Sequence, residues 1–280
     1  MAVLTLEGGD NECNRAMRGN YSRLEAFRLI QECLAPEYTV TIEKTAQALH
    51  ELLPPPDDPT YSGGADLFGD LILELSQQVE YDNPAQDRYV QVIQRLQDSD
   101  RVKKYIPQPE GVGYQGYGRY EIMPQLMTNL GQYSAQRMDK NGNQNYFVNV
   151  RAFIARLCRV GALQGQAWLV NEMKAAFEDI LPEQFHVVSI MGAAVIIEFA
   201  GAWLYEEVVR APKLDEIIDN PLWATGYYYN GPRYGIARWN HWQRLFRLAQ
   251  QTMTLDRESK RLMFYAEWYM HGISRSLQPY

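Results

Sequence analysis

The chain has 280 residues, of which 46% are hydrophobic and 22% are charged, and its formal net charge is -7 at neutral pH. This composition suits a globular protein with one large core or two smaller ones. The acidic balance argues against nucleic acid as a partner, because nucleic-acid affinity depends on clustered cations. Cys13, Cys33 and Cys158 lie far apart and favour neither a disulfide framework nor a zinc site. No secretory signal is visible, so we expect a cytoplasmic location.

Apolar residues recur at helical spacing along almost the whole chain. In the first half they predict helices over residues 24–34, 42–53, 67–79, 89–96 and 122–137. In the second half they predict helices over residues 147–161, 168–177, 185–209, 239–249 and 262–273, and Gly161 is placed to end the first of these. Alternation typical of strands is nearly absent. The expected fold class is all-α, with about ten helices in a single compact domain over residues 1–280.

Two long segments rich in tyrosine, glycine and proline interrupt the helices. They cover Tyr105–Pro124 and Asn220–Gly235. Loops of this length in a compact domain are uncommon and are often functional, and their aromatic content favours ordered loops over linkers. The first contains "GVGYQG", which matches the dinucleotide pattern GxGxxG. The pattern lacks the strand before it and the helix after it that would place a pyrophosphate, so no nucleotide cofactor is expected.

The most apolar stretch, "MGAAVIIEFAGAWLY" at Met191–Tyr205, contains a single carboxylate, that of Glu198. The stretch and its flanks are long enough to cross a bilayer, but Ser189, Glu198 and two glycines interrupt them, so we expect a buried helix and no membrane insertion. A buried carboxylate needs a partner or a chemical role. Small residues surround Glu198 on its helix face, so either an arginine meets it, with Arg156 the best candidate, or the space holds a ligand.

Aromatic residues beside the second loop are candidates for a binding pocket. Tyr227, Tyr228 and Tyr229 are consecutive and cannot all face one core, so at least one hydroxyl meets solvent or a cavity. We predict Arg156, Glu198 and Tyr228 as catalytic residues. The predicted substrate-binding residues are Trp203, Tyr227, Tyr229, Trp239, Trp242 and Tyr117. No histidine, cysteine or carboxylate set has metal-ligand spacing, so neither a metal nor another cofactor is expected.

Three segments of the second half resemble a known family. They are "NVRAFIARLCRVG" at Asn149–Gly161, "GAAVIIEFAGAWLY" at Gly192–Tyr205, and Ala237–Met270 with its RWxxWxxxF pattern. These segments resemble the fungal family of uncharacterised helical proteins catalogued as domain of unknown function 3632, most clearly over residues 149–270. The resemblance implies a fungal origin and an α-helical fold, and it brings no catalytic residues. Because some members of such families are encoded beside natural-product pathways, it also implies a setting in secondary metabolism.

Our leading functional hypothesis is a cofactor-independent enzyme that isomerises or cyclises an apolar terpenoid- or polyketide-like small molecule. A pericyclic reaction of Diels-Alder type is one form of it. Catalysis would come from holding the reacting carbons close together while a donor polarises a carbonyl. The alternative is a non-catalytic helical module that binds a protein or a small molecule, and this alternative predicts an exposed apolar patch on a helix face. A metal-dependent terpene cyclase is disfavoured because a second carboxylate cluster is missing. The oligomeric state stays open.

Overall fold

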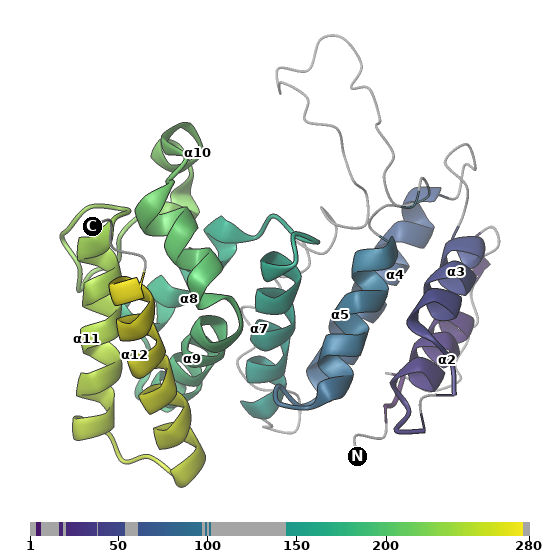
Figure 1. Cartoon of the computed structure of the whole chain (residues 1–280), viewed down its shortest axis with the longest axis horizontal. Helices are drawn as coiled ribbons and strands as arrows, with labels where there is room; N and C mark the ends of the chain where they lie inside the picture. The colour runs from purple at the N-terminus through teal and green to yellow at the C-terminus, as the bar shows by residue number, and fades with distance from the viewer. Residues whose placement is uncertain are drawn as a thin grey trace. The chain divides into compact units, whose positions relative to one another are not determined.

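A computed structural model of the chain describes residues 4–6, 17–18, 21–37, 39–53, 61–96, 99, 101 and 144–276. Most of these residues are helical, which confirms the all-α class (Figure 1). The predicted helix over residues 122–137, the loop Tyr105–Pro124 and Tyr117 lie outside the described residues. The chain forms two compact units, residues 1–136 and residues 137–280, and each is described by itself. The single domain over residues 1–280 therefore stays a prediction.

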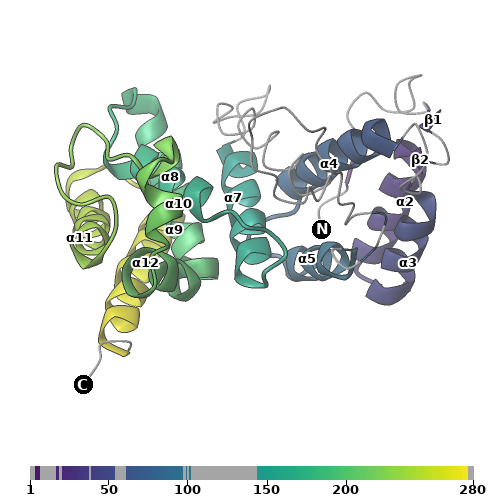
Figure 2. The same ribbon diagram turned by 90° about the horizontal axis from the view of Figure 1, so that it is seen from above.

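The first unit, unit 1, contains four helices and a two-stranded antiparallel ribbon among its described residues. The strands are β1 (Met17–Arg18) and β2 (Tyr21–Ser22), and the helices are α2 (Arg23–Leu34), α3 (Ile42–Leu52), α4 (Tyr61–Gln78) and α5 (Pro84–Leu96). The hydroxyls of Ser22 and Thr41 each accept a backbone N–H at the first turn of α2 and α3, which fixes where these helices begin. α3 packs against α2 and α5, and α2 also packs against α4 (Figure 2).

The second unit, unit 2, is built around one apolar helix. Its described elements are α7 (Gln144–Arg159), α8 (Gln166–Phe177), α9 (Glu183–Tyr205), η1 (Glu206–Arg210), α10 (Leu214–Ile218), η2 (Pro221–Trp223), α11 (Ile236–Thr252) and α12 (Arg257–Ser276). α7, α8 and α12 all pack against α9, and α11 lies along α12 (Figure 1). The core of unit 2 therefore lies on α9.

The central helix α9, continued by η1, is long and apolar enough to cross a membrane by length and composition alone. In the structure, 72% of its most apolar 18-residue window is buried inside the protein. The side chains of α9 are apolar on nearly all faces of the helix because other helices pack against it on several sides. A helix that is hydrophobic on all faces is stable only when it is buried. α9 is thus the buried helix that the sequence predicts.

A glycine on α9 determines how closely α12 approaches it. A Cβ added at Gly201 would lie 3.2 Å from Cδ1 of Ile273 and 3.3 Å from Cε1 of Tyr269. Both contacts are tighter than ordinary van der Waals packing, so a glycine at this position lets the α12 side chains rest directly on the α9 backbone. This close approach positions the outer side chains of α12 beside Glu198, which lies one turn earlier on α9.

The helices predicted over described residues are present, with differences only at their ends. Gly161 has a φ of 73°, and its N–H donates to the Cys158 carbonyl at 3.0 Å, so the predicted glycine does terminate the helix that ends at Arg159. Four short elements among the described residues were not predicted. These are the strands β1 and β2, the helix α10 and the 3₁₀ turn η2, and η2 lies inside the second tyrosine-rich loop.

Candidate functional site

A buried ion pair anchors the second tyrosine-rich loop. Glu178, directly after α8, receives Nε and Nη2 of Arg238 on α11 at 2.8 and 3.0 Å, and both side chains are fully buried. Glu178 also accepts Nε1 of Trp242 at 2.7 Å and the backbone N–H of Gly226 at 2.9 Å. The remaining Arg238 N–H groups donate to the carbonyls of Trp223, Ala224 and Arg233. Every charged atom of the pair is therefore satisfied, as a buried pair requires.

The three consecutive tyrosines of this loop point in different directions. Tyr227 and Tyr228 are 73% and 59% exposed, and their rings pack edge to face with centroids 5.1 Å apart. Tyr229 is buried, and its ring lies 4.6 Å from that of His241. The prediction that at least one hydroxyl meets solvent fits this arrangement. The structure does not bring the three tyrosines together around one pocket.

Tyr229 and His241 each hold a polar atom that lacks a partner among the described residues. These atoms are the Tyr229 hydroxyl and Nε2 of His241, and both are buried. Arg244 lies 3.4 Å from Nδ1 of His241, so Nδ1 is the acceptor and Nε2 carries the hydrogen in the neutral ring. Burial lowers the pKa of His241 and raises that of Tyr229. Both side chains are therefore held in their neutral forms.

The lowered pKa of His241 predicts a loss of stability in mild acid. Below pH 6.5 the unfolded chain gains a proton at His241, whereas the folded chain does not until its lower pKa is reached. The free energy of unfolding should consequently fall as the pH drops below 6.5. Replacing His241 with phenylalanine keeps a ring beside Tyr229 and removes this titration, so the variant should show a shallower decline. Thermal melts of both proteins between about pH 7.5 and about pH 5 measure the difference, and equal slopes would contradict the assignment.

The two predicted pocket tryptophans of α11 are core residues. Trp239 and Trp242 have no exposed surface, and the Trp239 ring packs edge to face on Tyr205 with centroids 5.0 Å apart. Trp242 gives its N–H to Glu178, whereas Nε1 of Trp239 lacks a partner among the described residues. Both rings lie in the buried core, and neither lines the hollow of unit 2 described below. That Trp239 and Trp242 line a substrate pocket stays a prediction.

Arg156 and Glu198 occupy very different surroundings. Arg156 is buried, and its guanidinium carbon lies 3.4 Å from the centroid of the Phe199 ring on α9. Glu198 is exposed, so the expectation of a buried carboxylate was wrong, and burial no longer requires an ionic partner for it. Trp203, a further predicted binding residue, is half-buried. The ion pair between Arg156 and Glu198 stays a prediction.

Glu198 nevertheless lies in a hollow of unit 2. This hollow, called the α9–α12 hollow below, measures about 440 Å³ and is lined by Glu198, Arg261, Tyr265, Trp268 and Tyr269. Three of the five side chains are aromatic, and one acid and one base stand among them. Glu198 and Tyr269 are far apart in the sequence, and they line the same hollow because α12 packs on α9 at Gly201.

The exposed aromatic side of α12 was not predicted from the sequence. By helical spacing alone, Tyr265 and Tyr269 would belong to the apolar stripe of the helix predicted over residues 262–273. In the structure both are exposed, together with Phe264 and Trp268, while the buried face carries Leu262, Met263, Ala266, Met270 and Ile273. The available signal was the number of large apolar residues, because they spread over more of the helix surface than one buried stripe needs.

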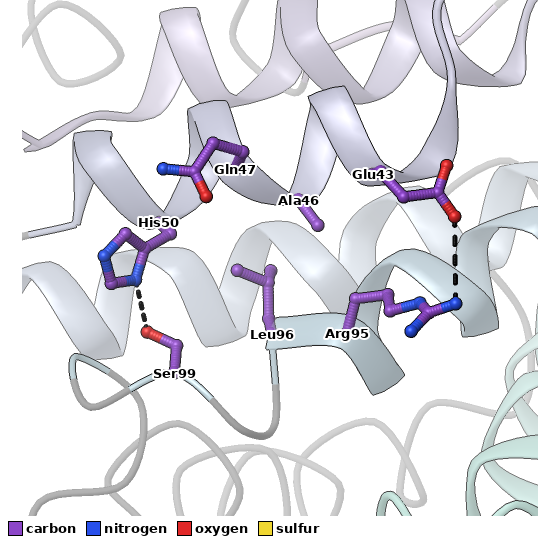
Figure 3. A pocket seen from close by; sticks show the side chains of 7 residues that line it. All are labelled: Glu43, Ala46, Gln47, His50, Arg95, Leu96 and Ser99. Carbon is purple, nitrogen blue, oxygen red and sulfur yellow. Dashed lines mark hydrogen bonds and ion pairs between the residues drawn. The ribbon is translucent and has the colours of Figure 1, made fainter.

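Unit 1 has a groove of its own, of about 560 Å³, between α3 and α5. Figure 3 shows the His50 ring turned toward Ser99, with Nδ1 and Oγ 2.5 Å apart, and Arg95 turned toward Glu43 at 3.7 Å. Ser99 also accepts the backbone N–H of Arg101, whose guanidinium donates to three carbonyls at the end of α3. These contacts attach the chain after α5 to the last turn of α3, which is a structural role.

No group of three His, Cys, Asp or Glu side chains suited to a metal ion occurs among the residues that the structure describes. Among the predicted site residues that the structure describes, Glu198 alone lines the α9–α12 hollow. The other predicted residues are distributed between the core, the exposed loop and the part of the chain outside the described residues, where Tyr117 lies. We therefore take the α9–α12 hollow, and not the tyrosine loop, as the candidate site.

Comparison with known proteins identifies a family. The family model described as protein of unknown function DUF3632 matches residues 70–246, more than half of the chain, and the chain therefore belongs to this family. Comparisons with curated proteins and with solved structures found no match. Within the hollow, Glu198 lies inside the matched segment, whereas the four α12 residues lie beyond it.

Proposed function

We propose that this DUF3632 protein binds a largely apolar small molecule in the α9–α12 hollow. One observation carries the proposal. Tyr265, Trp268 and Tyr269 gather around a hollow of about 440 Å³, although each of them is exposed. Contiguous exposed aromatic surface is costly for a protein that does not use it, and such patches mark binding sites. The volume is within the range of small-molecule pockets, about 300–1,000 Å³.

The lining also suggests how a ligand would be oriented. Aromatic faces bind planar rings or hydrocarbon chains without strict directional requirements. Glu198 and Arg261 at the same hollow offer a hydrogen-bond acceptor and donors, so a hydroxyl or carbonyl of the ligand would select one end. The opposite charges of these two residues favour a ligand with little net charge. An apolar molecule that carries one polar group fits this set best.

Binding without catalysis agrees better with this geometry than the cyclase or isomerase does. Catalysis by confinement needs a site from which water is excluded. Trp268 is 62% exposed, and the tryptophans proposed to enclose a substrate, Trp239 and Trp242, are packed in the core. A second proposal remains, in which the same hollow cyclises or isomerises a terpenoid- or polyketide-like substrate. Its setting would be fungal natural-product biosynthesis in the cytoplasm.

Titration with the neutral dye Nile red tests the binding proposal. The protein should bind the dye saturably, with a blue shift of its emission as the dye leaves water. Trp268→Ala should raise the dissociation constant about tenfold or more, because losing the contact of one large aromatic face exceeds the 1.4 kcal/mol that corresponds to a factor of ten. Trp268 is largely exposed, so this variant should stay folded.

Tyr227→Ala is the matched control, since it removes an equally exposed aromatic ring from the loop that the sequence favoured. It should leave the dissociation constant unchanged. Equal affinity of the Trp268 variant and the unsubstituted protein would overturn the proposal. If Tyr227→Ala weakened dye binding and Trp268→Ala did not, the binding site would be assigned to the tyrosine loop.

A further inference from the structure

The exposed side of α12 carries a second set of residues, which shares Trp268 with the α9–α12 hollow. This set, the outer stripe, consists of Arg257, Lys260, Phe264, Trp268 and Arg275. Their spacing of three, four, four and seven residues places them along one line of the helix. Phe264 is 54% exposed and does not line the α9–α12 hollow, so the hollow leaves its exposure unexplained. A partner that covers Phe264 must reach beyond the hollow.

The charge on this helix is opposite to that of the chain. α12 carries four exposed cations, namely Arg257, Lys260, Arg261 and Arg275. Its acids are Glu258 and Glu267, and Glu267 is bonded to Arg247 of the neighbouring helix at 2.5 Å. The chain as a whole has a net charge of -7. Basic residues therefore stand at both ends of an aromatic centre, on the surface of an acidic protein.

We propose that the outer stripe docks onto an anionic lipid bilayer. Aromatic rings settle at the headgroup level of a membrane, and flanking lysines and arginines are attracted to anionic headgroups. A helix with aromatic residues on its apolar side and cations beside them lies in the interface and does not span the membrane. α12 meets this description while its other face stays packed on α9.

The charge pattern favours lipid over a second copy of the chain. Two copies packed antiparallel through the outer stripe would place the basic end of each helix beside the basic end of the other, at Arg257 and Arg275. Like charges brought together in this way oppose association. The anionic headgroups of a bilayer surface instead attract all of these cations, because their charge is opposite. Charge complementarity thus selects the bilayer surface.

Co-sedimentation with vesicles tests this inference. The full chain should pellet with equimolar phosphatidylcholine–phosphatidylserine vesicles and stay in the supernatant with phosphatidylcholine alone, and added salt should release it. Phe264→Ala and Lys260→Glu should each weaken the partitioning about tenfold, the first through lost apolar contact and the second through reversed charge. The matched control Tyr228→Ala, which removes an exposed aromatic ring outside α12, should partition as the unsubstituted chain does.

The outcomes separate this inference from the proposed function. Phe264 and Lys260 do not line the hollow, so both variants should keep their affinity for Nile red. Equal pelleting with both vesicle types, no pelleting with either, or an unchanged partition of both variants would overturn the bilayer inference while leaving dye binding untouched. A change in sedimentation velocity of Phe264→Ala without vesicle binding would assign the outer stripe to contact between copies of the chain.

Discussion

Replacing Arg238 with leucine should lower the free energy of unfolding by about 3–5 kcal/mol. The substitution leaves the Glu178 carboxylate fully buried without its guanidinium partner, and it also removes the donors that hold three loop carbonyls. A buried charge that loses its partner retains its desolvation cost, which is why removing one member is so destabilising. Chemical denaturation followed by circular dichroism measures the loss.

An exposed pair in the same unit supplies the control. Arg210 and Glu206 form an ion pair at 2.6 Å, but both side chains are more than 40% exposed. Arg210→Leu should change the stability by about 0–1 kcal/mol, because water screens this pair. Losses of similar size in the Arg210 and Arg238 variants would contradict the structural role assigned to the buried pair.

Replacing Trp239 with alanine should destabilise the protein by about 3–5 kcal/mol, the usual effect of truncating a fully buried tryptophan. Its ring has no exposed surface and packs on Tyr205 between α9 and α11. If Trp239 instead lines a substrate pocket, as predicted from the sequence, its removal would weaken binding and leave the fold intact. The two interpretations therefore predict different losses in the midpoint of thermal unfolding.

Two variants sharpen this comparison. Trp239→Phe keeps an aromatic ring in the core and removes an N–H that has no partner among the described residues, so it should cost far less than the alanine substitution. Tyr227→Ala, on the exposed loop, should leave the midpoint unchanged. A stable Trp239→Ala variant would show that the ring lies in an open pocket.

The helices of unit 2 were predictable because their apolar residues repeat with the helical period. The period predicts a helix over 147–161, and the structure has α7 from Gln144 to Arg159, ended where Gly161 permits a positive φ. α9 was predictable for a different reason. A long run of apolar residues with almost no charge needs burial on all sides, whichever residues supply the cover.

The tyrosine loop was predictable as an ordered segment but not in its detailed conformation. Its anchor joins Glu178 to Arg238, sixty residues apart in the sequence. Nothing in the residues around Glu178 indicates that its carboxylate is buried, because the neighbouring segment after α8 reads as an ordinary polar connection. The anchor decides that Tyr229 turns inward and that Tyr227 and Tyr228 face solvent.

Glu198 and α12 show where reasoning from one helix at a time is limited. Glu198 stands among apolar residues in the sequence, yet it is exposed, as is Ala202 one turn later. On α12, Tyr265 and Tyr269 adjoin the buried face, so spacing alone assigns them to the core. The packing of α12 on α9 at Gly201 leaves them outside. The exposure of Glu198 and of the two tyrosines depends on contacts between helices. The periodicity of a single helix carries no information about these contacts.

Hydrogen–deuterium exchange of the full chain with and without saturating Nile red tests most directly whether the α9–α12 hollow is the binding site. We expect slower exchange in α12, over residues 257–276, and in the part of α9 that carries Glu198, with no change over the loop at residues 224–235. Protection of that loop without protection of α12 would contradict the assignment of the site to the hollow.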